Sequence, residues 1–149
     1  LYTARMPSSY KAGDGKVVRL FEDYVPVERA YYRETGLFPI MHAVAIRREV
    51  YEENRWVAQT LFKAFCEAQR LTYEDLAETA ALKAMLPWAN AHVEEAVREM
   101  GPDWWPYGFE KNRATLATFL RYHHEQGLSK RLLEPEDLFA PETLESFKI

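Results

Sequence analysis

The sequence predicts an α/β fold in which helices cover an incomplete sheet of about three strands. The main observation is the segment Leu37–Arg47 (LFPIMHAVAIR), which is apolar for nearly its whole length and rich in branched side chains. Continuous hydrophobicity of this kind is typical of a strand buried on both faces, as in the middle of a parallel sheet. Amphipathic patterns elsewhere predict about six helices, and only two other segments resemble strands. We therefore expect further sequence or another chain to complete the sheet.

The two other strand candidates lie near the start of the chain. Residues 1–5 form the first, which Pro7 ends, and residues 17–21 form the second. Between them, Gly13-Asp14-Gly15 has the composition of a turn.

Helices are expected wherever a start signal precedes an apolar pattern of 3.6-residue period. The start signals are Pro26, Asn54, the capping box of Thr72 with Asp75, Asn90 and Asn112. The expected helix ends are the glycines Gly36, Gly101 and Gly127. The tail from Leu132 to Ile149 is expected to form short helical pieces broken by Pro135 and Pro141.

Composition narrows the class of protein. The 149 residues are 48% hydrophobic and 28% charged, as in a soluble globular domain of ordinary size. The net charge of −4 disfavours nucleic-acid partners, and no apolar run reaches the roughly 18 residues of a membrane span. The single cysteine, Cys66, lies in an amphipathic helix pattern and is expected to be a structural thiol. Because the chain opens on Leu1 within a strand pattern, we expect a fragment and leave localisation open.

His42 is the first candidate site residue. It lies at the centre of the predicted buried strand, next to Met41, where an ionisable group is costly without a partner or a task. The alternative is a neutral core histidine bonded to a backbone carbonyl.

Arg5, Ser8 and Ser9 form the second candidate group. They follow the end of the first predicted strand, and ligands of open α/β sheets bind at such ends. A guanidinium with two hydroxyls suits a carboxylate. The alternative is an ordinary surface turn.

The third candidate is the segment Trp104–Gly108 (WWPYG), in which Tyr107 follows two tryptophans and a proline. These rings could form the wall of an aromatic pocket, or they could pin a loop against the helices. His123 and His124 are adjacent on a helix and point about 100° apart, so they cannot bind one metal ion together. The sequence reveals no metal site and no motif for an organic cofactor.

Several long blocks resemble the 4,5-dihydroxyphthalate decarboxylase family. They are PSSYKAG-DGKVVRLFEDY, VERAYYRETGLFPIMHAVAIRREVYEE, WVAQTLFKAFCEA, LPWANAHVEE and GPDWWPYGFEKNRATLATFLRYHHEQGLSKRLLEPEDLFAPETLE. The resemblance implies the two-lobed fold of type II periplasmic binding proteins. It also implies that residues 1–149 are the carboxy-terminal part of a chain roughly twice as long, without the amino-terminal lobe.

The resemblance implies a non-oxidative decarboxylase of 4,5-dihydroxyphthalate or a similar hydroxylated aromatic carboxylate. On this reading residue chemistry makes His42 the proton donor and Arg5 with Ser8 and Ser9 the carboxylate clamp. Tyr107 or a tryptophan forms the wall for the ring, and Met41 is a further substrate-binding residue. The alternative is a solute-binding protein that passes an aromatic acid to a transporter. The enzyme would be cytoplasmic and the solute-binding protein periplasmic.

Overall fold

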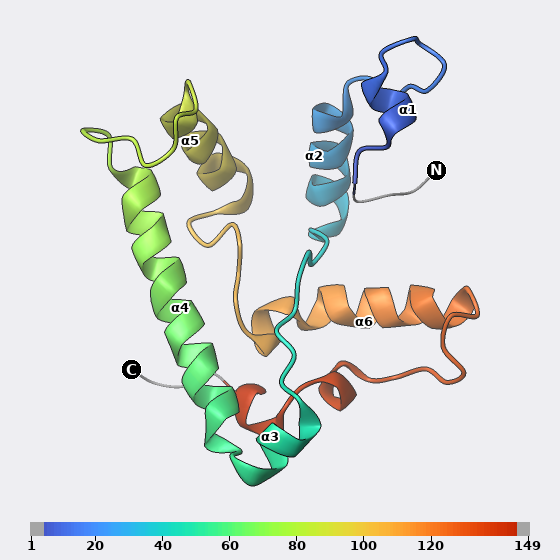
Figure 1. Ribbon diagram of the computed structural model, residues 1–149, viewed down its shortest axis with the longest axis vertical. Coiled ribbons are helices and arrows are strands. Elements are labelled where there is room, and N and C mark those ends of the chain that lie inside the picture. Colours follow the sequence, from blue (N-terminus) through green and yellow to red (C-terminus); the bar gives the residue numbers. More distant parts are fainter. Residues whose placement is uncertain (1–4, 146–149) are drawn as a thin grey trace. The chain divides into compact units, whose positions relative to one another are not determined.

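The computed structural model describes residues 5–145 and leaves Leu1–Ala4 and Ser146–Ile149 outside the described part. The chain divides into two compact units, residues 1–37 and 38–149, and each is considered by itself. Figure 1 labels the α-helices along the chain. The helical elements are α1 Ser8–Lys11, α2 Tyr24–Thr35, α3 Arg48–Glu53, α4 Trp56–Ala77, α5 Ala89–Met100 and α6 Phe109–Glu125, followed by the 3-10 turns η1 Pro135–Leu138 and η2 Pro141–Thr143.

The described residues contain no β-strand, so the predicted α/β fold with about three strands is wrong for residues 5–145. Residues 37–47 are irregular, and the side chains of Ile40, Met41 and Val44 are 42%, 53% and 64% exposed. A parallel strand needs a neighbour for its backbone N–H and C=O groups, and no other described segment supplies one. Residues 17–21 form bends and irregular chain, and of the strand predicted at 1–5 only Arg5 is described, in a bend.

The first unit is built around α2 and a preceding loop. The Arg19 guanidinium lies 4.7 Å from the ring centroid of Tyr24 and 5.9 Å from that of Tyr10. These cation–π contacts attach the loop to α1 and α2. The predicted stop at Gly36 is confirmed: its φ is 68°, and its N–H donates to the Tyr32 carbonyl at 2.7 Å.

The predicted helix starts differ from the structure at every asparagine. The helices α4, α5 and α6 begin at Trp56, Ala89 and Phe109, after Arg55, Trp88 and Gly108. None of these three preceding residues caps its helix through a side chain. Asn54 lies before α4, and Asn90 and Asn112 lie within their helices. Likewise α2 begins at Tyr24, two residues before Pro26.

The predicted helix boundary at Thr72 is also absent, since α4 runs without a break to Ala77. The Thr72 hydroxyl donates to the Ala68 carbonyl at 2.8 Å, one helical turn earlier. A threonine satisfied in this way is compatible with a helix interior. One long helix therefore replaces the two that the capping-box pattern predicted.

The core of the second unit includes the packing of α6 on η1. The buried side chains of the described residues are Ala58, Phe109, Leu116, Leu120 and Pro135. The rings of Phe109 and Phe139 meet edge-on at 5.7 Å, and Arg113 pairs with Glu136 at 2.8 Å. These contacts hold α6 against the tail of the chain, and α6 in turn positions the aromatic segment before it.

Candidate functional site

The aromatic segment Trp104–Gly108 lies in the connection between α5 and α6 and is held mainly by α4. The ring of Trp104 stacks on that of Tyr73, with centroids 4.2 Å apart and an interplanar angle of 24°. Trp104 is half-buried, whereas Trp105 is 43% exposed. Of the two readings of this segment, the structure shows that it is pinned to a helix, with one tryptophan still open to solvent.

Two residues of α4 hold the backbone of Trp105. Its N–H donates to the Tyr73 hydroxyl at 3.0 Å, and its carbonyl accepts a hydrogen bond from the side-chain amide of Gln69. The same amide donates to the Tyr73 hydroxyl at 3.3 Å. Gln69 and Tyr73 are four residues apart and therefore lie on one face of α4. From this face they bind both the N–H and the carbonyl of Trp105.

A charged pair completes this arrangement. The Tyr73 hydroxyl lies 3.4 Å from Asp103 Oδ1, and Lys111 Nζ lies 2.6 Å from Asp103 Oδ2. Burial raises the pKa of the Tyr73 hydroxyl, and the Asp103 carboxylate adds to this effect. The hydroxyl therefore stays protonated at neutral pH and can donate to Asp103.

Sequence reasoning missed Gln69 and Tyr73. Both belong to a half-buried stripe on α4 that also contains Phe62, Cys66 and Leu76, at helical spacing. Two polar side chains on an otherwise apolar stripe are a signal that each needs a buried partner. That signal could have linked α4 to a loop, although not to Trp105 in particular.

Asn112 and Gly108 close the aromatic segment on the side of α6. The Asn112 side-chain amide donates to the carbonyls of Pro106 at 2.8 Å and Gly108 at 2.9 Å. Gly108 has φ 102° and ψ 155°, a conformation that side chains disfavour. A Cβ there would also lie 3.1 Å from Phe62 Cζ. Tyr107, between these anchors, is half-buried.

Cys66 belongs to the same half-buried stripe of α4 as Gln69 and Tyr73. Burial raises the pKa of its thiol, while the Lys111 ammonium acts in the opposite direction. A raised pKa leaves little thiolate, the reactive form, at neutral pH. The thiol is half-buried, in agreement with the structural role predicted for it.

The segment with His42 starts beside the aromatic segment. The rings of Phe38 and Trp105 meet edge-on at 5.8 Å. Met41 and His42 follow, and both are exposed, so the predicted burial of His42 is wrong in this structure. No hydrogen bond or ion pair joins His42 to another described residue.

Arg5, Ser8 and Ser9 lie in the first unit, whereas Met41, His42 and Tyr107 belong to the second. Arg5 and both serines are exposed, and the serines form the start of α1. Within the second unit, the start of the His42 segment lies beside the aromatic segment. The proposed carboxylate-binding group belongs to the first unit.

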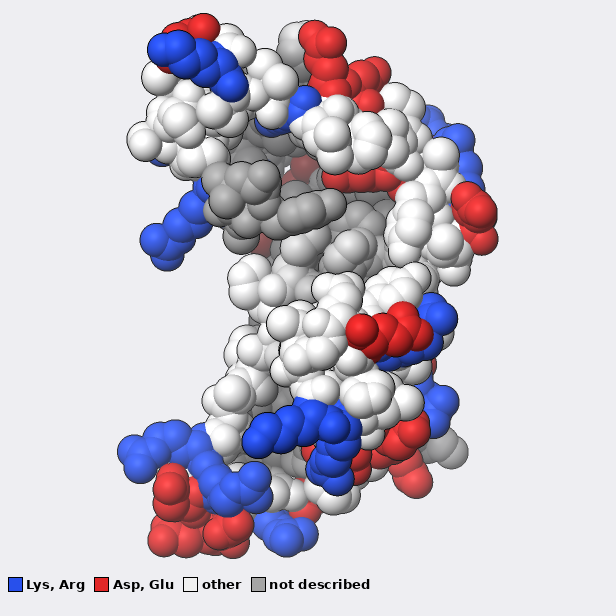
Figure 2. Space-filling view, turned by 90° about the vertical axis from the view of Figure 1, so that its right-hand side faces the viewer, with Lys and Arg blue, Asp and Glu red and all other residues white. Residues whose placement is uncertain are grey.

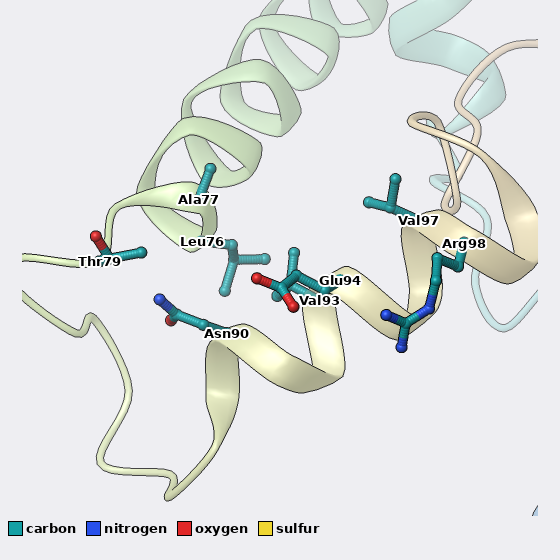
Figure 3. Close-up of a pocket in the computed structure, with 8 residues that line it drawn as sticks. All are labelled: Leu76, Ala77, Thr79, Asn90, Val93, Glu94, Val97 and Arg98. Carbon is teal, nitrogen blue, oxygen red and sulfur yellow. The ribbon is translucent and has the colours of Figure 1, made fainter.

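An apolar groove of about 460 Å³ lies between the end of α4 and α5 (Figure 3). Leu76 and Val93 face each other across it, and Arg98 comes from farther along α5. None of the predicted site residues lines it. Its walls are Leu76, Ala77, Thr79, Asn90, Val93, Glu94, Val97 and Arg98.

Charged side chains of both signs share the surface. On the face drawn in Figure 2, basic and acidic side chains lie next to one another in several places. Pairs within the helices include Arg70 with Glu67 at 2.7 Å and Arg48 with Glu52 at 3.9 Å. Within residues 5–145, no three His, Cys, Asp or Glu side chains are grouped so that they could hold a metal ion. No helix in this range is long and apolar enough to cross a membrane.

Comparison with known proteins supports the resemblance that the sequence blocks suggested. No protein-family model matches the chain. The chain is similar to 4,5-dihydroxyphthalate decarboxylase of Comamonas testosteroni, with 39% identity over 145 residues. The match covers 97% of this chain and 44% of that protein, so the chain spans less than half the length of this relative. The resemblance is thereby confirmed, and the carboxy-terminal position in a two-lobed domain stays a prediction.

Proposed function

We propose that this chain is part of a carboxy-lyase that removes CO2 from 4,5-dihydroxyphthalate or a similar hydroxylated aromatic carboxylate. The observation that carries the proposal is the 39% identity, over nearly the whole chain, to a protein named for this reaction. Because the chain spans 44% of that relative, the activity is proposed for the full-length gene product. As an enzyme, this product is expected in the cytoplasm.

The substrate itself supplies most of the driving force. In 4,5-dihydroxyphthalate each carboxylate has a hydroxyl para to it on the ring, and that hydroxyl pushes electron density toward the carbon bearing the carboxylate. Protonation of this carbon breaks aromaticity. The C–C bond to the carboxylate then breaks, its electron pair returns to the ring, and CO2 and protocatechuate are the products. The protein has to bind a dianion, donate one proton and keep the departing carboxylate poorly solvated.

His42 is the proposed proton donor. Its side chain is exposed, and no hydrogen bond or ion pair occupies it within residues 5–145, so its imidazole is accessible to a ligand. Histidine is the side chain that most often transfers protons in enzymes, and a general acid has to give up and regain a proton in each turnover. Met41, next to it and 53% exposed, is a proposed ring contact.

The aromatic segment is the proposed wall for the ring of the substrate. Trp105 is partly exposed and lies edge-on to Phe38, four residues before His42. Tyr107 is the second proposed ring contact from this segment. An aromatic substrate would gain stacking contacts from such side chains. Arg5 with Ser8 and Ser9 is the proposed carboxylate clamp, because a guanidinium and two hydroxyls can all donate to carboxylate oxygens.

The direct test is turnover by the full-length gene product, supplied with divalent metal ions and incubated with 4,5-dihydroxyphthalate. We expect release of CO2 and formation of protocatechuate in equal amounts. Phthalate is the matched control substrate: it carries both carboxylates but lacks the hydroxyls that assist protonation. It should bind and stay unchanged.

Two outcomes decide against the enzyme. Tight binding of 4,5-dihydroxyphthalate without CO2 release, in folded and metal-supplied protein, would favour a solute-binding protein instead. Absence of both binding and turnover would remove this substrate class altogether.

A further inference from the structure

We propose that Tyr73 is a positioning residue for the ligand wall and acts through Trp105. This inference rests on the proposed function, because it assumes that Trp105 lines the site in which the substrate ring binds. Tyr73 lies on α4 and need not touch the ligand itself. Tyr73 and Gln69, its partner on α4, together hold both backbone polar groups of Trp105.

The hydroxyl of Tyr73 contacts three polar groups. A phenolic hydroxyl can both accept and donate hydrogen bonds. Here it accepts from Trp105 N–H at 3.0 Å and from the Gln69 amide at 3.3 Å, and it faces Asp103 Oδ1 at 3.4 Å as a donor. Its ring meanwhile stacks on Trp104. One side chain thus fixes three consecutive residues, Asp103, Trp104 and Trp105.

The ring of Trp105 lies next to the start of the segment that carries His42, the proposed proton donor. The Trp105 ring meets Phe38 edge-on at 5.8 Å, and Phe38 begins the segment that bears His42. Because the backbone of Trp105 is held from α4, the point from which its ring projects toward Phe38 is fixed. The geometry therefore links Tyr73 to Trp105 and then to the His42 segment.

Removing only the hydroxyl tests this link. In the full-length gene product, Tyr73→Phe keeps the stacked ring and should raise KM for 4,5-dihydroxyphthalate about 3- to 10-fold, the range expected for one lost hydrogen bond. Its kcat should change by less than about 2-fold, because wall contacts act equally on ground and transition states. The control is Tyr122→Phe, which removes an exposed hydroxyl on α6 and should leave both parameters unchanged.

A double-mutant cycle shows whether Tyr73 acts through Trp105. Trp105→Ala removes the ring through which Tyr73 is proposed to act, so adding Tyr73→Phe in that background should raise KM by less than about 2-fold. An additive effect would mean that Tyr73 acts elsewhere and would overturn the inference. If Tyr73→Phe fails to fold, Gln69→Met, which removes the second backbone contact, takes its place in the cycle and decides by the same criterion.

Phthalate binding, monitored by tryptophan fluorescence, distinguishes failure of the positioning role of Tyr73 from failure of the proposed function. Turnover by the wild type with unchanged KM and phthalate affinity in Tyr73→Phe would sink the inference and leave the function standing. Wild-type protein that binds phthalate but does not turn over 4,5-dihydroxyphthalate would sink the function. Weaker phthalate binding by Tyr73→Phe, cancelled in the Trp105→Ala background, would then still support the positioning role.

Discussion

The Tyr51 hydroxyl donates a 2.7 Å hydrogen bond to Glu142 Oε2, although the two residues are 91 positions apart in the chain. Arg55 Nη1 lies 3.6 Å from the other carboxylate oxygen, and its guanidinium lies 5.5 Å from the ring centroid of Tyr51. This three-residue cluster connects α3 and the start of α4 to η2.

The cluster predicts a pH dependence of stability. The Tyr51 hydroxyl, ahead of the Arg55 guanidinium, lowers the pKa of Glu142 below its ordinary value. A carboxylate with a lowered folded-state pKa stabilises the fold above its unfolded pKa, and this contribution is lost as the pH falls through the folded value. We therefore expect Glu142→Gln to lower the thermal midpoint of the full-length gene product at pH 7 more than at about pH 3.

The control for this prediction is Glu22→Gln. Glu22 is exposed, and no other described residue forms an ion pair or hydrogen bond with it. The wild-type and Glu22→Gln midpoints should follow each other across the pH range. A Glu142→Gln deficit that is the same at both pH values would contradict the assignment.

Leu120 is predicted to be the most sensitive aliphatic position of α6. Its side chain is 5% exposed in the core between α6 and the neighbouring elements. Truncation of such a side chain leaves a cavity, so Leu120→Ala should cost about 2–5 kcal/mol of unfolding free energy, measured by chemical denaturation. Leu128→Ala, at a position 65% exposed, is the matched control and should cost less than about 0.5 kcal/mol. Equal losses at both positions would mean that the core lies elsewhere.

Gly108 and Gly101 form a matched pair for backbone strain. Both adopt a conformation that is almost confined to glycine, with φ and ψ of 102° and 155° at Gly108 and of 86° and 179° at Gly101. Alanine at either position should cost about 1–3 kcal/mol. Gly108→Ala should cost more, because its Cβ would lie 3.1 Å from Phe62, whereas nothing lies within 4 Å at Gly101.

A second substitution tests whether contact with Phe62 causes the larger loss of stability in Gly108→Ala. Phe62→Leu should reduce the difference between the two glycine variants in thermal unfolding, since it removes the ring atoms that a Cβ would meet. If Gly101→Ala were the more damaging variant, steric contact with Phe62 could not be the deciding term.

His42→Gln is predicted to separate binding from chemistry. The substitution removes the proposed proton donor and keeps a polar side chain of similar size. Turnover of 4,5-dihydroxyphthalate by the full-length gene product should fall about 10²- to 10⁴-fold, the usual contribution of general acid catalysis. Phthalate affinity should change little. His92→Gln, at an exposed position of α5, is the control, and unchanged turnover in His42→Gln would exclude His42 from the mechanism.

Glycine positions were predicted well from the sequence because their signal is local. Gly36 and Gly101 end α2 and α5 as expected, since a positive φ at a helix end needs no distant partner. Asparagines failed as start signals for the opposite reason. Asn112 can bind a backbone carbonyl from inside a helix as readily as an N–H from its start, and the structure shows the first case.

The strand prediction failed because a pattern of hydrophobicity shows only that a segment tends to be buried. Whether residues 37–47 form a strand depends on neighbours that no described segment provides. The candidate site was likewise predicted only in its local part. The aromatic composition of Trp104–Gly108 drew attention to it, yet the contacts that hold Trp105 come from Gln69 and Tyr73, more than 30 positions earlier.

The unbroken course of α4 has a mechanical consequence. The helix begins next to the Arg55–Glu142 pair, binds Trp105 through Tyr73 and ends at the groove beside α5. At a rise of 1.5 Å per residue, Trp56 and Tyr73 are separated by roughly 26 Å along a nearly inextensible axis. A movement of one end along the helix axis would displace the other attachment points by the same amount, whereas a joint at Thr72 would have absorbed the movement.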